Sequence, residues 1–390
     1  MSSTELLSQM EPQRDEMRSL RHTLHARPEL GYEEFATSEL VAQQLTSWGY
    51  AVHRGLGKTG VVGQLRCGDG ARRIGLRADM DALPIHEATG LPYASTIAGK
   101  MHACGHDGHT ASLLGAAKHL AQTRRFNGVV NLIFQPAEEG RGGAKAMMDD
   151  GLFVKFPCDA VYAFHNMPGI ATGQFGFRAG PFMASSDLVS ISLQGRGGHG
   201  AAPHRAVDPI VACASIVMAL QTIVARNVDP QETAVVTVGA MSAGQAANVI
   251  PDTAELKLSV RAFRADVRDL LERRIKDLVA AQAHSFGVQA TVEYSRNYPV
   301  LVNHVEQTAY ARRVAAQWLG EDHLVADMPA LAGSEDFAFI LEQQPGCYFV
   351  IGNGDGEEGC MVHNPGYDFN DAILPLAAGY WVRLVQDYLR

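Results

Sequence analysis

Residues 109–140, HTASLLGAAKHLAQTRRFNGVVNLIFQPAEEG, contain the pattern that decides the fold class of this chain. The first part, about His109 to Leu120, is rich in small apolar residues and predicts a helix. The second part, Val129 to Phe134, is a short apolar run that is typical of a strand buried on both faces. Such a strand lies inside a sheet that helices cover on both sides, so the segment predicts an α/β domain.

The same alternation of helices and strands continues on both sides of this segment. Helical patterns precede it at about Thr4 to Leu24 and Ala36 to Trp48, and a closing helix is predicted at Tyr380 to Leu389. Strand patterns occur at Val61 to Leu65, Ile74 to Ala78 and Ala160 to Phe164. Because the alternation resumes after Pro299, we expect the first and last segments to form one discontinuous domain.

The middle of the chain follows a different pattern, in the order strand, helix, strand, strand, helix, strand. This order is typical of the ferredoxin-like α+β unit. Its segments are Leu188 to Leu193, Asp208 to Val224, Ala234 to Val238, Glu255 to Arg261, Asp266 to Phe286 and Val288 to Tyr294. We therefore predict an inserted domain at residues 185–296 and a discontinuous domain made of residues 1–184 and 297–390.

Composition narrows the class of protein. The chain has 390 residues, 46% of them hydrophobic, and a formal net charge of -9, which provides no basic face for nucleic acid. No apolar run approaches the ~18 residues that span a bilayer, and the acidic residues between Met1 and Leu20 are unlike a signal or transit peptide. The six cysteines show no paired spacing, so we expect reduced thiols and a cytoplasmic protein without a membrane partner.

The run from Met101 to Thr110 is the densest group of residues that could carry chemistry. Within eight positions, just before the predicted helix, it contains His102, Cys104, His106, Asp107 and His109. A thiolate and an imidazole two residues apart in a loop can hold a zinc-like ion. A polar loop that caps the helix would explain the run equally well, so the run alone does not decide between the two.

Further candidate ligands follow predicted apolar strands. Glu138 and Glu139 come directly after the strand of residues 129–134, where α/β sheets place their functional groups. One carboxylate could bind a metal ion while its neighbour takes a proton from an attacking water. His165 and His363 also follow predicted apolar strands. Ligand candidates at three strand ends favour a metal site over unrelated structural residues.

The types of donor favour a catalytic centre over a structural zinc site. Structural zinc usually has four Cys or His ligands, whereas this set mixes a thiolate, imidazoles and adjacent carboxylates. Asp79 and Asp81 also end a predicted strand and could either bind metal or orient the ligand histidines. Two G-x-G-x-x-G patterns, at residues 55–60 and 195–200, do not favour a nucleotide enzyme, since the first leads into a strand and the second lacks the acidic residue that usually follows.

Together these motifs resemble those of the dinuclear-metal amidohydrolases that include hippurate hydrolase, indole-3-acetyl amino acid hydrolases and N-acetyldiaminopimelate deacetylase. These enzymes form a branch of the aminoacylase and glutamate carboxypeptidase family, and the resemblance extends from about His22 to His363. It implies a zinc-exopeptidase-like α/β catalytic domain with a mixed sheet between helices, and an inserted ferredoxin-like lid domain. It also implies hydrolysis of N-acyl amino acids with hippurate-like or N-acetyl groups. The alternative is a dipeptidase or aminopeptidase that uses the same two-metal site.

The resemblance also implies a role for each motif residue. Glu138 would be the general base, and Asp79 would orient a ligand without binding metal itself. The implied ions are two divalent cations per subunit, of zinc, manganese, cobalt or nickel, since all four tolerate nitrogen, oxygen and sulfur donors. Their implied ligands are Cys104, His106, Glu139, His165 and His363.

The implied lid domain carries part of the active site. The segment Gly197 to Pro203 resembles the lid motif whose histidine, His199 here, stabilises the tetrahedral oxyanion. Asn248 and Arg261 match lid positions that contact the carboxylate end of the substrate, a task that suits the guanidinium fork. In the family the lid histidine can reach the site of the partner subunit. The resemblance therefore implies a homodimer, or a higher homo-oligomer, formed through the lid domain.

Overall fold

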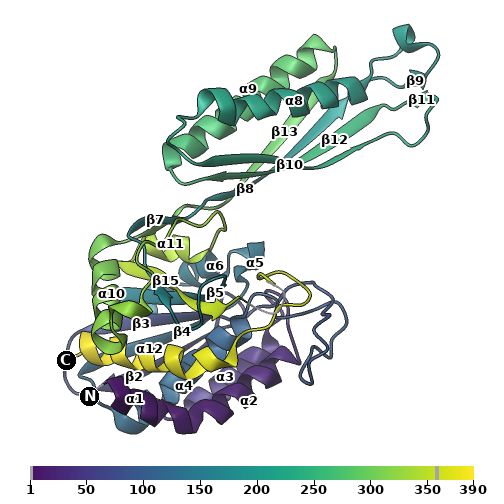
Figure 1. Cartoon of the computed structure of the whole chain (residues 1–390). Coiled ribbons are helices and arrows are strands. Elements are labelled where there is room, and N and C mark those ends of the chain that lie inside the picture. Colours follow the sequence, from purple (N-terminus) through teal and green to yellow (C-terminus); the bar gives the residue numbers. More distant parts are fainter. Residues whose placement is uncertain (1–2, 356–359) are drawn as a thin grey trace. The chain divides into compact units, whose positions relative to one another are not determined.

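The computed structural model describes residues 3–355 and 360–390, and the chain divides into two compact units (Figure 1). The larger unit consists of Met1–Gly180, Val302–Pro329 and Asp336–Arg390, and the smaller unit of Pro181–Leu301 and Ala330–Glu335. Strands β7 (Gly180–Met183) and β14 (Leu301–Asn303) lie where the chain passes between the units. The segment at residues 330–335 belongs to the smaller unit, where the N–H of Leu331 donates to the carbonyl of Phe182 at 2.8 Å.

The described part of the larger unit is built on a mixed sheet of seven strands, in the order β1-β2-β4-β3-β5-β15-β6. The bounds are Ala51–Leu56 (β1), Gly60–Cys67 (β2), Arg73–Asp79 (β3), Gly128–Gln135 (β4), Ala160–Pro168 (β5), Phe175–Gly176 (β6) and Gly346–Gly354 (β15). β3 runs parallel to β4 and β5, and β15 runs parallel to β5. Every residue of β4 is buried, which explains why this strand is apolar almost throughout.

Helices cover both faces of the sheet (Figure 1). α4 (His106–Thr123) and α12 (Leu374–Tyr388) pack together on one face, with α2 (Arg14–His25) against α4, while α6 and α11 cover the other. The remaining helices are α1 (Ser3–Met10), α3 (Phe35–Ser47), α5 (Glu138–Arg141), α6 (Gly143–Asp149), α7 (Leu152–Lys155), α10 (Val305–Leu319) and α11 (Phe337–Leu341). Short 3-10 turns lie at Glu11–Gln13, Glu321–His323 and Asp371–Ile373. The predicted α/β class, with a mixed sheet between helices, is confirmed.

The structure differs from the sequence prediction at the N-terminal helix and at strand β1, as well as in several shorter elements. The single helix predicted at Thr4 to Leu24 is split into α1 and α2 by the 3-10 turn at Glu11–Gln13, because Pro12 has no N–H to continue the helical ladder. Strand β1 has no counterpart in the prediction. Most of its residues are exposed or half-buried, so it lacks the apolar run that marks the other strands.

The smaller unit, all of whose residues are described, has a sheet of four antiparallel strands in the order β10-β12-β8-β13. The elements along the chain are β8 (Ser186–Gln194), α8 (Pro209–Asn227), β10 (Ala234–Ala243), β12 (Thr253–Ala262), α9 (Ala265–Ser285) and β13 (Gln289–Tyr298). This succession is that of a ferredoxin-like unit. Buried and exposed residues alternate along β12, because the two helices cover only one face of the sheet. A short ribbon, β9 (Gly198–His199) with β11 (Val249–Ile250), and a 3-10 turn at Pro203–Arg205 complete the unit.

Helix α8 is more apolar than the sequence analysis indicates. Among the described helices it alone is long and apolar enough to cross a membrane by length and composition. Core helices of globular domains pass the same test, and Ile216, Leu220 and Ile223 of α8 lie in the hydrophobic core of the smaller unit. The opposite side of α8 exposes Val211 and Met218. The helix therefore has a buried apolar side and an exposed apolar side.

Candidate metal centre

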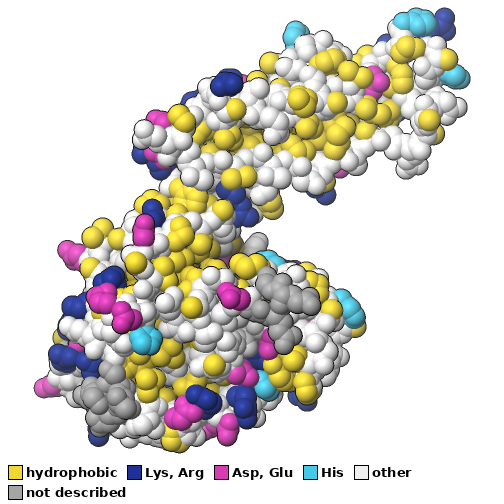
Figure 2. Space-filling view, in the orientation of Figure 1, with side chains coloured by type: hydrophobic (Ala, Val, Ile, Leu, Met, Phe, Trp, Pro, Cys, Tyr) yellow, Lys and Arg dark blue, Asp and Glu magenta, His cyan; other side chains and the backbone are white. Residues whose placement is uncertain are grey.

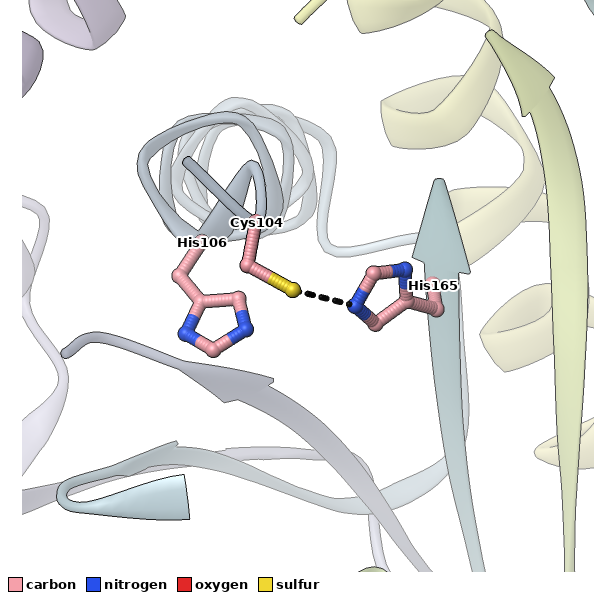
Figure 3. A group of neighbouring side chains, drawn as sticks. All are labelled: Cys104, His106 and His165. Carbon is pink, nitrogen blue, oxygen red and sulfur yellow. Dashed lines mark hydrogen bonds between the residues drawn. The ribbon is translucent and has the colours of Figure 1, made fainter. Parts of the chain in front are cut away.

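Strands β4 and β5 and the beginning of one helix bring four of the five predicted ligands to the same edge of the sheet. β3, β4 and β5 are parallel, so their carboxyl ends lie together. Glu138 and Glu139 follow β4, and His165 lies near the end of β5. α4 begins at His106, directly after the loop that carries Cys104. Figure 3 shows Cys104 and His106 at this end of the helix, facing His165 on the neighbouring strand.

The donor atoms of the centre lie within a few ångströms of one another. Cys104 Sγ is 3.3 Å from His165 Nε2, and the two side chains point toward each other (Figure 3). Five sets of described residues each have all their donor atoms within 4.8 Å of one another, and three of these consist only of the predicted ligands and the predicted base. These three sets are Cys104, His106 and His165; Cys104, Glu139 and His363; and His106, Glu138 and Glu139. The five predicted ligands and the predicted base thus form one cluster.

His363 reaches this cluster from the C-terminal part of the chain. Its backbone N–H donates to the carbonyl of Ala103 at 2.7 Å, which ties it to the loop of Cys104. Its φ of +66° is a left-handed conformation that is rare for a residue with a side chain. Its Nε2 lies 3.2 Å from Glu139 Oε1, and its side chain remains 51% exposed. His363 is therefore the most exposed residue of the cluster, and its backbone conformation is strained.

Negative charge exceeds positive charge in the buried part of the centre. Asp79, Asp81 and Glu138 are all buried, and the buried Arg77 pairs with Asp79 at 2.7 Å. Burial lowers the pKa of His106, but Asp79 and Asp81 outweigh burial and raise it to about 10. A buried site that favours positive charge this strongly is suited to divalent cations, because buried carboxylates need a compensating charge.

The state of the donor atoms also fits metal ions. Burial, together with the carboxylates of Glu139 and Glu138, raises the pKa of the Cys104 thiol well above its usual range, and a coordinated cation is what removes such a proton. Burial lowers the pKa of His165 well below its usual range, so its ring is neutral, the form that binds metals. Nε2 of His106 is buried and has no hydrogen-bond partner among the described residues. The donor set therefore has the chemistry of a metal centre, and His106 contributes a buried ring nitrogen that no group of the described residues occupies.

Asp79 and Asp81 occupy different places around these donors. Asp79 pairs with Arg77 and lies 2.6 Å from Nδ1 of His109, so its two oxygens are engaged by protein groups. Asp81 Oδ1 is 3.2 Å from Nδ1 of the predicted ligand His106, and Oδ2 accepts the N–H of Glu139 at 2.9 Å. Contacts of this kind orient ligands and fix the tautomer of an imidazole. Asp81 thus makes the contact with a predicted ligand, whereas the side-chain hydrogen bonds of Asp79 go to Arg77 and His109, which are not predicted ligands. The predicted role of Asp79 in orienting a ligand stays a prediction.

Asn166 links several parts of the centre and was not singled out by the sequence. Its Nδ2 donates to the carbonyl of Cys104 at 2.7 Å, and its Oδ1 accepts from the hydroxyl of Tyr367. Its backbone N–H donates to Nε2 of His109 at 3.0 Å, which agrees with a proton on the Nδ1 that faces Asp79. A Cβ atom at position 105 would lie 2.4 Å from Asn166 Nδ2, so only glycine allows the Cys104 loop to come this close to Asn166. The only sequence signal for Asn166 is its position next to His165.

His199 and Asn248 lie together at one end of the smaller unit. His199 of β9 pairs with Val249 of β11, and the N–H of Gly200 donates to the carbonyl of Asn248 at 2.8 Å. Nδ1 of His199 accepts from the N–H of Ala201 at 3.0 Å. In the neutral ring, the proton is therefore on Nε2. The side chain of His199 is exposed, so Nε2 can donate to another molecule.

Arg261 lies elsewhere in the smaller unit. Thr253, at the start of β12, pairs with Gln194, where β8 ends and the chain continues toward His199. Arg261 is eight residues further along β12, which corresponds to ~26 Å of strand. Burial lowers the pKa of Arg261, and its Nη1 is buried without a hydrogen-bond partner among the described residues. The structure thus does not bring Arg261 beside His199 and Asn248.

Comparison with known proteins identifies the family. The model of peptidase family M20/M25/M40 matches residues 75–387. The chain belongs to this family. It is 48% identical to hippurate hydrolase of Campylobacter jejuni over 96% of this chain and 97% of the relative, and 39% identical to IAA-amino acid hydrolase ILR1-like 2 of Arabidopsis thaliana over 96% and 86%. The solved structure of a Bacillus subtilis protein, described as a dinuclear metal binding peptidase of the M20 family, superposes with a TM-score of 0.82 at 31% identity, covering 97% of this chain and 99% of the other.

These matches confirm the predicted family and the predicted architecture of this M20-family chain. The buried donor cluster and the M20 match together support divalent metal binding. The identity of the ions and the role of each residue stay predictions.

The position of Asn166 leads to a test of the centre. We expect Asn166→Ala to weaken metal binding by about 10- to 100-fold, because the Cys104 loop and the His165 strand lose the amide that joins them. Calorimetric titration of the metal-depleted protein would measure the change. Asn127→Ala is the matched control, since Asn127 is an exposed asparagine that accepts a backbone N–H from Gly70. Equal metal affinities for the two variants would contradict the proposed link.

Proposed function

We propose that this chain is a metal-dependent amidohydrolase that cleaves the amide bond of N-acyl amino acids to a carboxylic acid and a free amino acid. The observation that carries the proposal is the buried cluster of thiol, imidazole and carboxylate donors, with Glu138 in it. Similarity to hippurate hydrolase along nearly the whole of both chains supports an N-acyl amino acid as substrate. It favours this substrate class over the dipeptides of the alternative, a dipeptidase or aminopeptidase with the same centre.

The proposed cofactors are two divalent ions per subunit. Zinc, manganese, cobalt and nickel all accept a mixture of thiolate, imidazole and carboxylate ligands, so the donor set is compatible with each of them. When bound, the ions lower the pKa of a water molecule and polarise the scissile carbonyl. The ligands we propose are Cys104, His106, Glu139, His165 and His363.

Glu138 is the proposed general base. Its carboxyl group is buried, and its Oε1 accepts from the N–H of Asp336 at 3.4 Å. A carboxylate oxygen of Glu138 lies within 4.8 Å of donor atoms of His106 and Glu139, close to where the attacking water must be. Glu138 takes a proton from this water as the carbon–oxygen bond forms, and gives it to the amide nitrogen as the carbon–nitrogen bond breaks. The carboxylate is thereby regenerated.

His199 is the proposed donor to the oxyanion of the tetrahedral intermediate. Because its Nδ1 accepts the N–H of Ala201, the neutral ring carries a proton on Nε2 and can donate it in a hydrogen bond. A donor aimed at the negative oxygen stabilises the transition state more than the substrate.

Arg261 is the proposed contact for the substrate carboxylate, and Asn248 a further contact at this end of the substrate. The guanidinium of Arg261 is half-buried with Nη1 unpaired, so it is available for a carboxylate ligand. The carbonyl and the carboxylate of an N-acyl amino acid are separated by a few bonds, whereas Arg261 and His199 are separated by most of the length of β12. We therefore propose that the two residues act on one substrate from different subunits.

The smaller unit provides a surface for such a dimer. Val211 and Met218 on α8 are 51% and 70% exposed, and Met241 on the edge strand β10 is 47% exposed. Figure 2 shows hydrophobic side chains gathered on the visible face of this unit. An exposed apolar patch beside an unpaired strand edge is typical of an interface between subunits. We propose that α8 and β10 pair with the same elements of a second copy.

The cysteines bear on the compartment in which the protein works. All six lie in the described residues, and none forms a disulfide. Reduced thiols support the proposed cytoplasmic location, which fractionation of the source cells would test.

Replacing the proposed base should separate catalysis from metal binding. We expect Glu138→Gln to lower kcat for hippurate by about 10²- to 10⁴-fold, because the amide cannot take the proton of the water. The variant should keep its metal. Glu139→Gln is the matched control and should lose metal as well as activity. Initial rates and elemental analysis would measure the two effects. A Glu138→Gln protein with its metal and a wild-type rate would rule out this base.

The role of Arg261 is tested by comparing two substrates. We expect Arg261→Ala to lower kcat/KM for hippurate by about 10- to 100-fold and to leave that for hippuramide within about twofold, because the amide lacks the carboxylate. Lys257→Ala, an exposed cation on the same strand, should change neither value. Equal losses on both substrates would contradict carboxylate recognition by Arg261. A preference of the wild-type enzyme for an unblocked dipeptide over hippurate would instead favour the peptidase alternative.

The proposed dimer is tested at α8. We expect Met218→Glu to shift the protein toward monomers in light scattering, because a carboxylate would be buried in the apolar interface. If His199 acts on the partner's substrate, the monomers should also lose activity while keeping their metal. Val154→Glu, at an 87% exposed position of the larger unit, should change neither property. A fully active wild-type monomer would contradict both parts of the proposal.

A further inference from the structure

The turn that carries the proposed base contains a strained residue. Ala137, directly before Glu138, has φ 53° and ψ 43°, a left-handed conformation that residues with a Cβ rarely adopt. Ala137 is fully buried, so this conformation is not a product of a loose surface loop. A strained conformation persists only where the surrounding structure holds it, and it often marks a functional site.

Glu34 provides the contact that holds Ala137. Its Oε1 accepts the N–H of Ala137 at 2.8 Å, and its Oε2 accepts from the hydroxyl of Thr59 at 2.6 Å. Both oxygens are therefore engaged, and the side chain is completely buried. Hydrogen bonds to a carboxylate are stronger than those between neutral groups, so this contact can hold a backbone against strain. Glu34 comes just before α3, 103 residues away from Ala137 in the sequence.

Two more carboxylates hold the backbone that follows, at Glu139 and in helix α6. Asp81 accepts the N–H of Glu139, and Asp336 accepts the N–H of Ala144 at 2.9 Å each. Asp81 also contacts the proposed ligand His106, and Asp336 also pairs with Arg77. The hydrogen bonds of Glu34, by contrast, go to Ala137 and Thr59, which are neither proposed ligands nor the base. Glu34 therefore allows the conformation of the turn to be changed without removing a group that touches the metal or the substrate.

We propose that Glu34 is a positioning residue for the general base, which holds Ala137 in the left-handed conformation and so directs the carboxylate of Glu138 to the reacting water. This inference rests on the proposed function of Glu138. Without Glu34, Ala137 relaxes toward negative φ in a fraction of the molecules, and Glu138 in those molecules leaves its place. Chemistry slows, while the proposed contacts of the substrate with Arg261 and of the ions with their ligands remain. The expected effect is thus on kcat, with KM and metal content unchanged.

The test compares Glu34→Ala, Glu34→Gln and Ala137→Gly. We expect Glu34→Ala to lower kcat for hippurate by about tenfold, since the left-handed conformation is then unsupported. Glu34→Gln should lose less, because the amide oxygen can still accept the N–H of Ala137. Glycine adopts positive φ without a Cβ penalty. Adding Ala137→Gly to Glu34→Ala should therefore raise kcat by about threefold or more. In the wild-type protein, Ala137→Gly should change kcat by less than about twofold.

Glu33→Gln is the matched control, because Glu33 is the exposed neighbour of Glu34 and pairs with Lys100 at the surface. It should have wild-type kcat. If Glu34→Ala does not fold, Glu34→Gln with and without Ala137→Gly provides the same comparison, and thermal unfolding of each variant shows which proteins are folded.

Three results would overturn the inference. These are a wild-type kcat for the folded Glu34 variants, a loss of metal in parallel with kcat, and an absence of rescue by Ala137→Gly. Glu138→Gln is measured beside them. If it is inactive with its metal bound and the Glu34 variants are fully active, the positioning role fails while the proposed function stands. If it is fully active, the proposed function itself fails.

Discussion

Buried negative charge at the carboxyl ends of β3 and β4 is the constraint on which the larger unit depends. Asp79, Asp81 and Glu138 are buried there, and the buried Arg77 pairs with Asp79. An uncompensated buried ion costs several kcal/mol, so each carboxylate needs a partner. Arg77 and His109 serve Asp79, and His106 with a backbone N–H serves Asp81. Bound divalent ions would supply the remaining positive charge, and their binding would then be coupled to the stability of the fold.

The apolar sheet beneath the centre makes this concentration of charge and strain tolerable. β4 and most of β15 are buried along their length, so the strand ends from which the site is built cannot shift independently. Two residues with side chains, Ala137 and His363, adopt left-handed conformations at the centre, and hydrogen bonds to Glu34 and to Ala103 hold them. Strain at the site is thus balanced by packing and hydrogen bonds outside it.

The smaller unit contributes chemistry of a different kind. Its exposed residues His199 and Asn248 lie at one end, whereas the half-buried Arg261 lies toward the other end of β12. This separation follows from the antiparallel register of β8 and β12 and does not depend on how the two units are arranged. In the proposed enzyme, recognition of one small substrate by both ends would require groups from two copies, and the exposed apolar side of α8 is the proposed contact between these copies. Dimer formation and catalysis are then linked in the proposed enzyme.

The sequence by itself determined the α/β class, the ferredoxin-like order and the residues of the donor cluster, because buried strands and dense ligand motifs leave local patterns. It left Asp79 undecided and missed Asn166 and Glu34. Asn166 meets the Cys104 carbonyl 62 residues away, and Glu34 meets Ala137 103 residues away. No sequence motif indicates that Arg261 and His199 lie far apart in the smaller unit. Only the tertiary structure showed the contacts of Asn166 and Glu34 and the position of Arg261, because a contact between distant segments is set by strand register and side-chain packing and has no periodicity along the chain.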